Sequence, residues 1–254
     1  MVYNGALDAS LIAALAAGML VAAFGYAAVG HGGASAYIAA MALAGIAPAE
    51  MRPIALTLNI LVSAMATYKF QRAGYFQWRL FWPFAVVSIP LAFVGGAITL
   101  PGHAYKILVG VVLIYAAWQL WRSARAGDEM RTVREPPLPW AMAVGAALGL
   151  LSGLTGVGGG IFLSPVLLLL GWAGTKQTSA VAAPFILVNS LAGLAAGFTM
   201  QSASLPSYVW ILVPAVLVGG WLGAEYGSRR FANPLVRRIL AVALALAGAK
   251  MILA

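Results

Sequence analysis

The chain has 254 residues, of which 63% are hydrophobic and 8% are charged. This leaves too little polar surface to cover a water-soluble globule, so the composition predicts a membrane protein. The formal net charge of +9 does not indicate a nucleic-acid partner, because the Lys and Arg residues punctuate apolar runs and do not form one face. The absence of cysteine excludes disulfides, thiolate metal sites and thiol nucleophiles.

Eight apolar segments approach the roughly 20 helical residues that are needed to cross about 30 Å of hydrocarbon. We place them at residues 9–29, 52–69, 79–100, 104–121, 139–157, 177–199, 207–225 and 234–253. The expected fold class is therefore an all-α integral membrane protein that crosses the bilayer several times.

Two further apolar segments, 34–46 and 160–172, are shorter, and each follows a glycine-rich break. The first break reads Gly30-His31-Gly32-Gly33, and the second reads Gly156-Val157-Gly158-Gly159-Gly160. A helix of this length rises only about 20 Å, so its glycine end should stop inside the hydrocarbon layer, where protein or water must surround it. Asn59 follows the first short segment and Asn189 follows the second.

This repetition predicts a first transmembrane repeat at 1–121, a linker at 122–139 and a second repeat at 140–254. Each half contains five elements, one of them a short helix that begins at a glycine break. Because five is odd, the second half should be inverted relative to the first, as in many secondary transporters.

The basic residues agree with this inversion. Residues 69–79 contain three of them and the equivalent residues 200–207 contain none, whereas 226–238 contain four and the equivalent 101–106 contain one. The positive-inside rule then places the linker in the cytoplasm and both termini outside.

The expected spans contain no Asp, Glu, Lys or Arg away from their ends, which argues against a metal transporter or a carboxylate-driven proton pump. An intramembrane protease would need a Ser/His pair or two aspartates, and the whole chain has only two histidines. We therefore expect no enzyme activity, catalytic residue, metal or cofactor. Recognition is left to backbone amides and to small polar side chains, namely Ser35, Thr57, Asn59, Ser63, Ser164, Thr178, Ser179, Asn189 and Ser190.

A helix that begins at a glycine turn presents free N–H groups and a partial positive charge, which suit an anion. Two such helices entering from opposite faces would aim at one anion site. The expected substrate-binding residues are Gly30, His31, Gly32, Gly33, Asn59, Ser63, Gly156, Gly158, Gly159, Gly160, Asn189 and Ser190. Close helix packing is the alternative role for the glycines, and an interhelical hydrogen bond is the alternative for each asparagine.

Two further positions, His31 and Arg52, each allow two interpretations. His31 is the titratable residue of the breaks, and we expect it either to relay a proton during transport or to bond the backbone. Arg52 could attract anions at the outer face or extend to the interface. Thr178 and Ser179 are expected to cap the start of their helix.

The run from Gly149 to Gly160, GLLSGLTGVGGG, followed by Pro165, Gly171 and Thr178-Ser179, resembles the TauE/SafE family of sulfite and organosulfonate exporters. The resemblance extends over nearly the whole chain. It implies transport of small sulfur-containing anions, such as sulfite, sulfoacetate or taurine-derived sulfonates, at the bacterial inner membrane. The first half departs from the pattern, since Ala34 stands where the second half has Gly160.

These observations together predict a multi-pass secondary transporter that moves a small sulfur-containing anion by alternating access. An anion channel, a carrier for another small organic anion, and a membrane enzyme or assembly factor are the alternatives. A proton or sodium ion as coupling ion, and a homodimer in the lipid bilayer, are left open by the sequence.

Overall fold

The computed structural model describes residues 8–123, 134–229 and 234–253, and all regular structure in these ranges is α-helical. The helices are α1 (Ala9–Ala27), α2 (Ala34–Leu43), α3 (Pro48–Arg72), α4 (Trp78–Ala97), α5 (Gly102–Ser123), α6 (Leu138–Thr155), α7 (Gly160–Leu169), α8 (Thr175–Met200), α9 (Val209–Arg229) and α10 (Pro234–Leu253). The predicted all-α integral membrane protein is thereby confirmed.

Seven of the eight expected spans are helices that are long and apolar enough to cross a membrane. The eighth corresponds to α10, of which Leu240–Leu253 is an apolar helix shorter than a span. Residues 124–133 of the predicted linker lie outside the described residues.

The two short helices have the expected positions. Both α2 and α7 contain ten residues, and each begins at the residue that follows the left-handed glycine of its break. Such a helix rises about 15 Å, roughly half of the hydrocarbon thickness. Neither short helix is therefore long enough to cross the hydrocarbon layer by itself.

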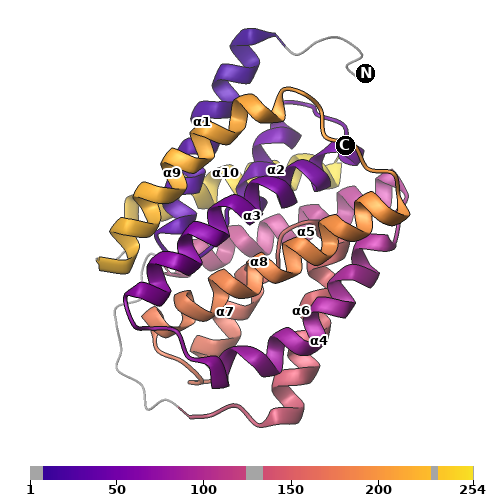
Figure 1. Cartoon of the computed structure of the whole chain (residues 1–254). Helices are drawn as coiled ribbons and strands as arrows, with labels where there is room; N and C mark the ends of the chain where they lie inside the picture. The colour runs from indigo at the N-terminus through magenta and orange to yellow at the C-terminus, as the bar shows by residue number, and fades with distance from the viewer. Residues whose placement is uncertain (1–7, 124–133, 230–233, 254) are drawn as a thin grey trace.

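Helices α3 and α8 lie side by side at the centre of the molecule (Figure 1). They run antiparallel, because Arg52 near the start of α3 bonds Gln201 just beyond the end of α8, and Asn59 bonds Ser190 further along. On one side α1 packs on α9, and on the other α4 packs on α6 (Figure 1).

Helices that precede residues 124–133 thus pack on helices that follow them. By order in the chain α1 and α6 are the first helices of the two sets of five and α4 and α9 are the fourth, so the α1–α9 and α4–α6 pairs each join a first helix to a fourth helix. The central α3–α8 pair and the α5–α10 pair each join a helix to its own counterpart.

Two stripes of glycine make the α4–α6 and α1–α9 contacts close. Gly145, Gly149 and Gly153 on α6 face α4, and Gly219, Gly223 and Gly227 on α9 face the α1 segment. A Cβ atom added at any of the six would lie 2.0 to 2.4 Å from a carbonyl oxygen of the facing backbone. A larger side chain would therefore force the helices apart.

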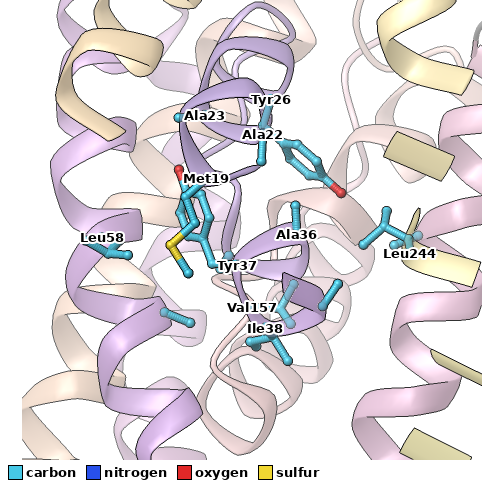
Figure 2. Close-up of a cluster of buried hydrophobic side chains, with 14 of the residues drawn as sticks. Met19, Ala22, Ala23, Tyr26, Ala36, Tyr37, Ile38, Leu58, Val157 and Leu244 are labelled. Atoms are coloured by element: carbon cyan, nitrogen blue, oxygen red, sulfur yellow. The ribbon is translucent and has the colours of Figure 1, made fainter. Parts of the chain in front are cut away.

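The core around α1, α2 and α3 is apolar and extends to the second glycine break. Figure 2 shows Met19, Tyr37, Ile38 and Leu58 among its members, together with Val157 of the second break. Val157 is 4% exposed. The second break thus packs against helices of the first half.

Candidate functional site

The two glycine breaks meet inside the helical bundle. All glycines of both breaks are buried and His31 is half-buried. Gly32 of the first break and Gly158 of the second both lie against the carboxamide of Asn59, since a Cβ at either position would be 1.8 Å from Asn59 Oδ1 or 2.3 Å from Asn59 Nδ2. Neither break is exposed to bulk solvent, and one residue touches both.

Asn59 is fully buried and uses both ends of its side chain within the protein. Its Oδ1 accepts a hydrogen bond from the backbone N–H of Ala34, the first residue of α2, over 3.2 Å. Its Nδ2 donates to Ser190 Oγ on α8 over 2.9 Å. Asn59 therefore holds the start of α2 and ties α3 to α8, which matches the interhelical alternative stated for it.

The second break has a different neighbour at the equivalent position. Ile186 lies seven residues after Ser179, as Asn59 lies seven after Arg52. A Cβ at Gly160 would be 2.3 Å from the Ile186 side chain. An apolar residue thus occupies the place against α7 that Asn59 occupies against α2.

Asn189 and Ser63, which the sequence placed in the same site, bond within their own helices. Asn189 Nδ2 donates to the Phe185 carbonyl over 2.7 Å, and Ser63 Oγ donates to the Ile60 carbonyl over 3.3 Å. Asn189 Oδ1 is buried with no hydrogen-bond partner among the described residues. It is an acceptor held in the core of the bundle.

His31 joins the first break to the first turn of α7. Its Nδ1 lies 3.0 Å from the Val29 carbonyl oxygen, and its Nε2 lies 3.2 Å from the Gly160 carbonyl oxygen. Ser164 Oγ on α7 is 3.1 Å from the same Nε2. The imidazole is therefore the polar bridge between the two breaks, as Asn59 is between the two central helices.

Two tyrosines support the first break, and the sequence analysis did not identify them. Tyr37 is fully buried and donates to the Gly32 carbonyl over 2.8 Å, while Ser35 donates to the Tyr26 hydroxyl over 2.8 Å. Tyrosines usually lie at the membrane interface, so the position of Tyr26 and Tyr37 within apolar runs is the sequence feature that indicates their hydrogen bonding at the first break.

Each break is closed on its other side by the first part of a central helix. At Gly30 the neighbour is Ser179, whose backbone oxygen would lie 2.5 Å from an added Cβ. At Gly156 it is Arg52, whose Cγ would lie 2.7 Å away. The two sides therefore differ chemically, with a serine at the first break and the aliphatic part of an arginine side chain at the second.

Arg52 reaches away from the break to the carbonyl end of α4. It donates to the Gly96 carbonyl over 2.7 Å, to the Ile98 carbonyl over 3.3 Å and to the side chain of Gln201. Gln201 also donates to the Gly96 carbonyl over 3.0 Å. Arg52 thus joins α3, α4 and the end of α8.

Glu50 and Tyr208 form a second contact near the start of α3. Tyr208 donates to Glu50 Oε2 over 2.9 Å. Partial burial, and then the adjacent carboxylate, raise the pKa of the Tyr208 hydroxyl above its ordinary value, so it remains a donor.

The predicted caps of α8 are wrong. The helix begins at Thr175 after Gly174, and Gln177 Oε1 accepts from the Gly174 N–H over 3.0 Å. Ser179 lies in the following turn, where its hydroxyl donates to the Val29 carbonyl over 2.9 Å and so binds the first break. Thr178 Oγ1 is buried with no hydrogen-bond partner among the described residues.

The geometry suits a small anion better than a cation. Gly33 and Gly159 adopt left-handed conformations just before α2 and α7, which glycine does without a steric penalty. Asn59 accepts from the first N–H group of α2, that of Ala34, so the remaining N–H groups in the first turn of α2 and those in the first turn of α7 carry the partial positive charge. The two helix ends supply donors, and His31, Asn59 and Ser190 supply adaptable polar groups beside them.

Comparison with known proteins assigns the chain to a family. The family described as sulfite exporter TauE/SafE matches residues 14–251, nearly all of the chain. The chain belongs to the TauE/SafE family.

Two curated relatives extend the comparison of this TauE/SafE protein. It is 42% identical over 241 residues to "Probable membrane transporter protein y4hK" of Sinorhizobium fredii (strain NBRC 101917 / NGR234), covering 94% of this chain and 97% of that protein. It is 27% identical over 204 residues to "Probable membrane transporter protein ORF9" of Sinorhizobium sp, covering 79% and 76%. No solved structure gives a significant match.

The run from Gly149 to Gly160, which carries the resemblance to TauE/SafE, has two structural parts. Gly149 and Gly153 belong to the stripe on which α4 packs, whereas Gly156, Gly158 and the residues after them form the second break. The motif thus joins a packing surface to a candidate binding element in one short stretch.

Proposed function

We propose that this TauE/SafE protein is a secondary transporter of small sulfur-containing anions, such as sulfite and sulfonates, at the bacterial inner membrane. The observation that carries the proposal is the meeting of the two glycine breaks at the Asn59–Ser190 hydrogen bond. Two broken helices that meet within the depth of the bilayer are the arrangement in which transporters bind substrates. The TauE/SafE match supports the substrate class.

The proposed binding residues divide by role. Backbone N–H groups from both breaks bind the anion, namely those of Gly32, Gly33, Gly158, Gly159 and Gly160. The predicted use of the Gly30 and Gly156 N–H groups is wrong, because they donate to the Ala27 and Ser152 carbonyls over 3.0 and 2.9 Å and close the ends of α1 and α6. The side chains of His31, Asn59 and Ser190 lie among them, and Ser63 and Asn189 brace the helices behind.

Alternating access is the mechanism that we propose. The α1–α9 and α4–α6 contacts and the antiparallel α3–α8 pair support an inverted relation between repeats 1–121 and 140–254. In this arrangement the linker is cytoplasmic and both termini face outward. Movement of Arg52 away from Gly156 then opens the breaks to the outside, and movement of Ser179 away from Gly30 opens them to the cytoplasm.

Reconstitution into liposomes tests the substrate class. We expect saturable flux of radiolabelled sulfite or sulfonates that exceeds flux of carboxylates of similar size. The Gly158→Ala variant should lose this flux and the Gly45→Ala variant should retain it, because both glycines have positive φ but only Gly158 lies in a break. Equal flux in liposomes without protein would contradict the proposal.

An anion channel would use the same backbone donors, so electrical recording distinguishes it. A carrier gives turnover-limited flux with no single-channel currents. Resolved single-channel currents in planar bilayers would favour the channel and exclude alternating access.

A further inference from the structure

The imidazole of His31 lies between two backbone carbonyls from different segments. Nδ1 is 3.0 Å from the Val29 oxygen in the first break, and Nε2 is 3.2 Å from the Gly160 oxygen at the start of α7. A carbonyl oxygen can only accept a hydrogen bond. Each ring nitrogen thus faces an acceptor.

A neutral imidazole cannot satisfy both contacts. It has one N–H, so its other nitrogen turns a lone pair toward a carbonyl oxygen, whereas the imidazolium donates on both sides. Ser164 Oγ, 3.1 Å from Nε2, suits both states because a hydroxyl can donate to a lone pair or accept from an N–H. Only the protonated ring donates to both carbonyls, whereas a neutral ring protonated on Nδ1 donates to Val29 and accepts from Ser164.

Tyr26 on α1 and Lys176 on α8 are ionisable residues on the surrounding helices. The Tyr26 ring stands edge-on to His31, with centroids 6.3 Å apart, and its hydroxyl accepts from Ser35. Lys176 lies one turn before Ser179 and donates to the Tyr75 hydroxyl over 3.3 Å and to a backbone carbonyl.

The charged residues of the neighbouring long helices have other partners. On α3, Arg52 donates to the end of α4, and Glu50 accepts from Tyr208. On α9, Glu225 pairs with Lys69 and with Arg229. A proton on His31 thus adds positive charge at the breaks themselves.

We propose that His31 is the proton-binding site that couples anion transport to a proton gradient; this rests on the proposed function. Water on the open side supplies the proton to the ring nitrogen that carries the lone pair. The imidazolium ties the first break to α7 and attracts the anion, so proton and anion reinforce each other's binding. On the opposite side the ring releases the proton to water together with the anion, as symport.

Magnetic resonance of isotope-labelled histidine tests the proton site without any substrate. The chain has two histidines, and His103 is exposed at the start of α5, so the His103→Gln variant reports on His31 alone. We expect the His31 ring to change from neutral to doubly protonated between about pH 8 and pH 5. A ring that stays neutral over this range while the protein remains folded would overturn the proposal.

Flux measurements test the coupling, with methanesulfonate as a probe that carries one negative charge. An inward proton gradient of one pH unit should accumulate it about tenfold through one-to-one symport, independently of membrane potential. His31→Gln should abolish accumulation, and the matched His103→Gln should retain it.

The outcomes separate the two proposals. Undiminished accumulation by a folded His31→Gln variant would overturn the proton site but leave the proposed transport function standing. Absence of flux for every sulfur-containing anion would contradict the transport function, while the resonance titration would still decide whether His31 binds a proton. If His31→Gln does not fold, the same titration decides.

Discussion

Asn59 Nδ2 donates to Ser190 Oγ over 2.9 Å and so links the two central helices at the point where both glycine breaks lie. The opposite end of the same carboxamide accepts from the first N–H of α2. One side chain therefore fixes the start of a short helix, the α3–α8 contact and the approach of the second break.

Replacing Asn59 by alanine should destabilise the protein more than replacing Asn189. Asn59→Ala leaves the Ala34 N–H and the Ser190 hydroxyl without this partner, and each buried unsatisfied group costs about 1–3 kcal/mol. Asn189→Ala removes a bond within one helix and an acceptor that has no partner among the described residues. Thermal unfolding in detergent measures both, and equal losses would contradict the bracing role.

Gly158→Ala should be more harmful than Gly45→Ala. Both glycines have left-handed φ, +82° and +78°, so both variants incur the backbone penalty of about 1–2 kcal/mol. A Cβ at Gly158 also lies 2.3 Å from Asn59 Nδ2, whereas nothing lies within 4 Å of one at Gly45. The difference between the unfolding temperatures of the two variants isolates the steric contribution of the added methyl group at the break. A larger decrease in unfolding temperature for Gly45→Ala would contradict this contribution.

Arg52→Gln should loosen the side of the molecule near Gly156. The variant removes donors from the Gly96 and Ile98 carbonyls, and lowering the free energy of opening by about 1.4 kcal/mol raises the population of the open state about tenfold. The chain contains no cysteine, so maleimide labelling of Val157→Cys, a buried position, reports this opening without background.

Arg72→Gln is the control for that measurement. Arg72 is exposed at the other end of α3 and donates to Tyr68 on the same helix. Labelling that is equally fast in both variants would show that Arg52 does not close the break.

Gly223→Ala should weaken the contact between α9 and α1. The added Cβ would lie 2.2 Å from the Phe24 carbonyl oxygen, and such overpacking costs about 1–3 kcal/mol. Gly18→Ala on exposed α1 surface has nothing within 4 Å, so better helix propensity should stabilise it by up to about 1 kcal/mol. Denaturation in detergent should show a lower unfolding free energy for Gly223→Ala and a higher one for Gly18→Ala. A change in the same direction for both variants would contradict the role of the stripe in close helix packing.

Much of the fold follows from local sequence. Apolar length predicts the long helices, and glycines directly before apolar runs predict that α2 and α7 begin at Ala34 and Gly160. The start of α8 was misjudged because Ser and Thr are strong caps in general, whereas here Gly174 with the Gln177 side chain takes that place.

The detailed site depends on contacts that a linear pattern does not contain. By sequence position Asn189 is the counterpart of Asn59, but the residue that faces the second break is Ile186, whose apolar side chain gives no polar signal in the sequence. The stripe glycines, such as Gly149, recur every four residues in the sequence, yet the helix that each stripe faces is a tertiary relation.

The stripe of Gly219, Gly223 and Gly227 lies on α9, near the end of the chain, and this has a consequence for biogenesis. Helix α1 is among the first segments to leave the ribosome. The glycine surface that contacts the Phe24 backbone is translated much later, because Gly223 lies on α9. After insertion, the face of α1 that packs on α9 is therefore exposed to lipid until α9 has been translated and inserted. Truncation before α9 should therefore leave this face of α1 exposed to lipid, with α2 and α3 as the packing partners that precede α9 in the chain.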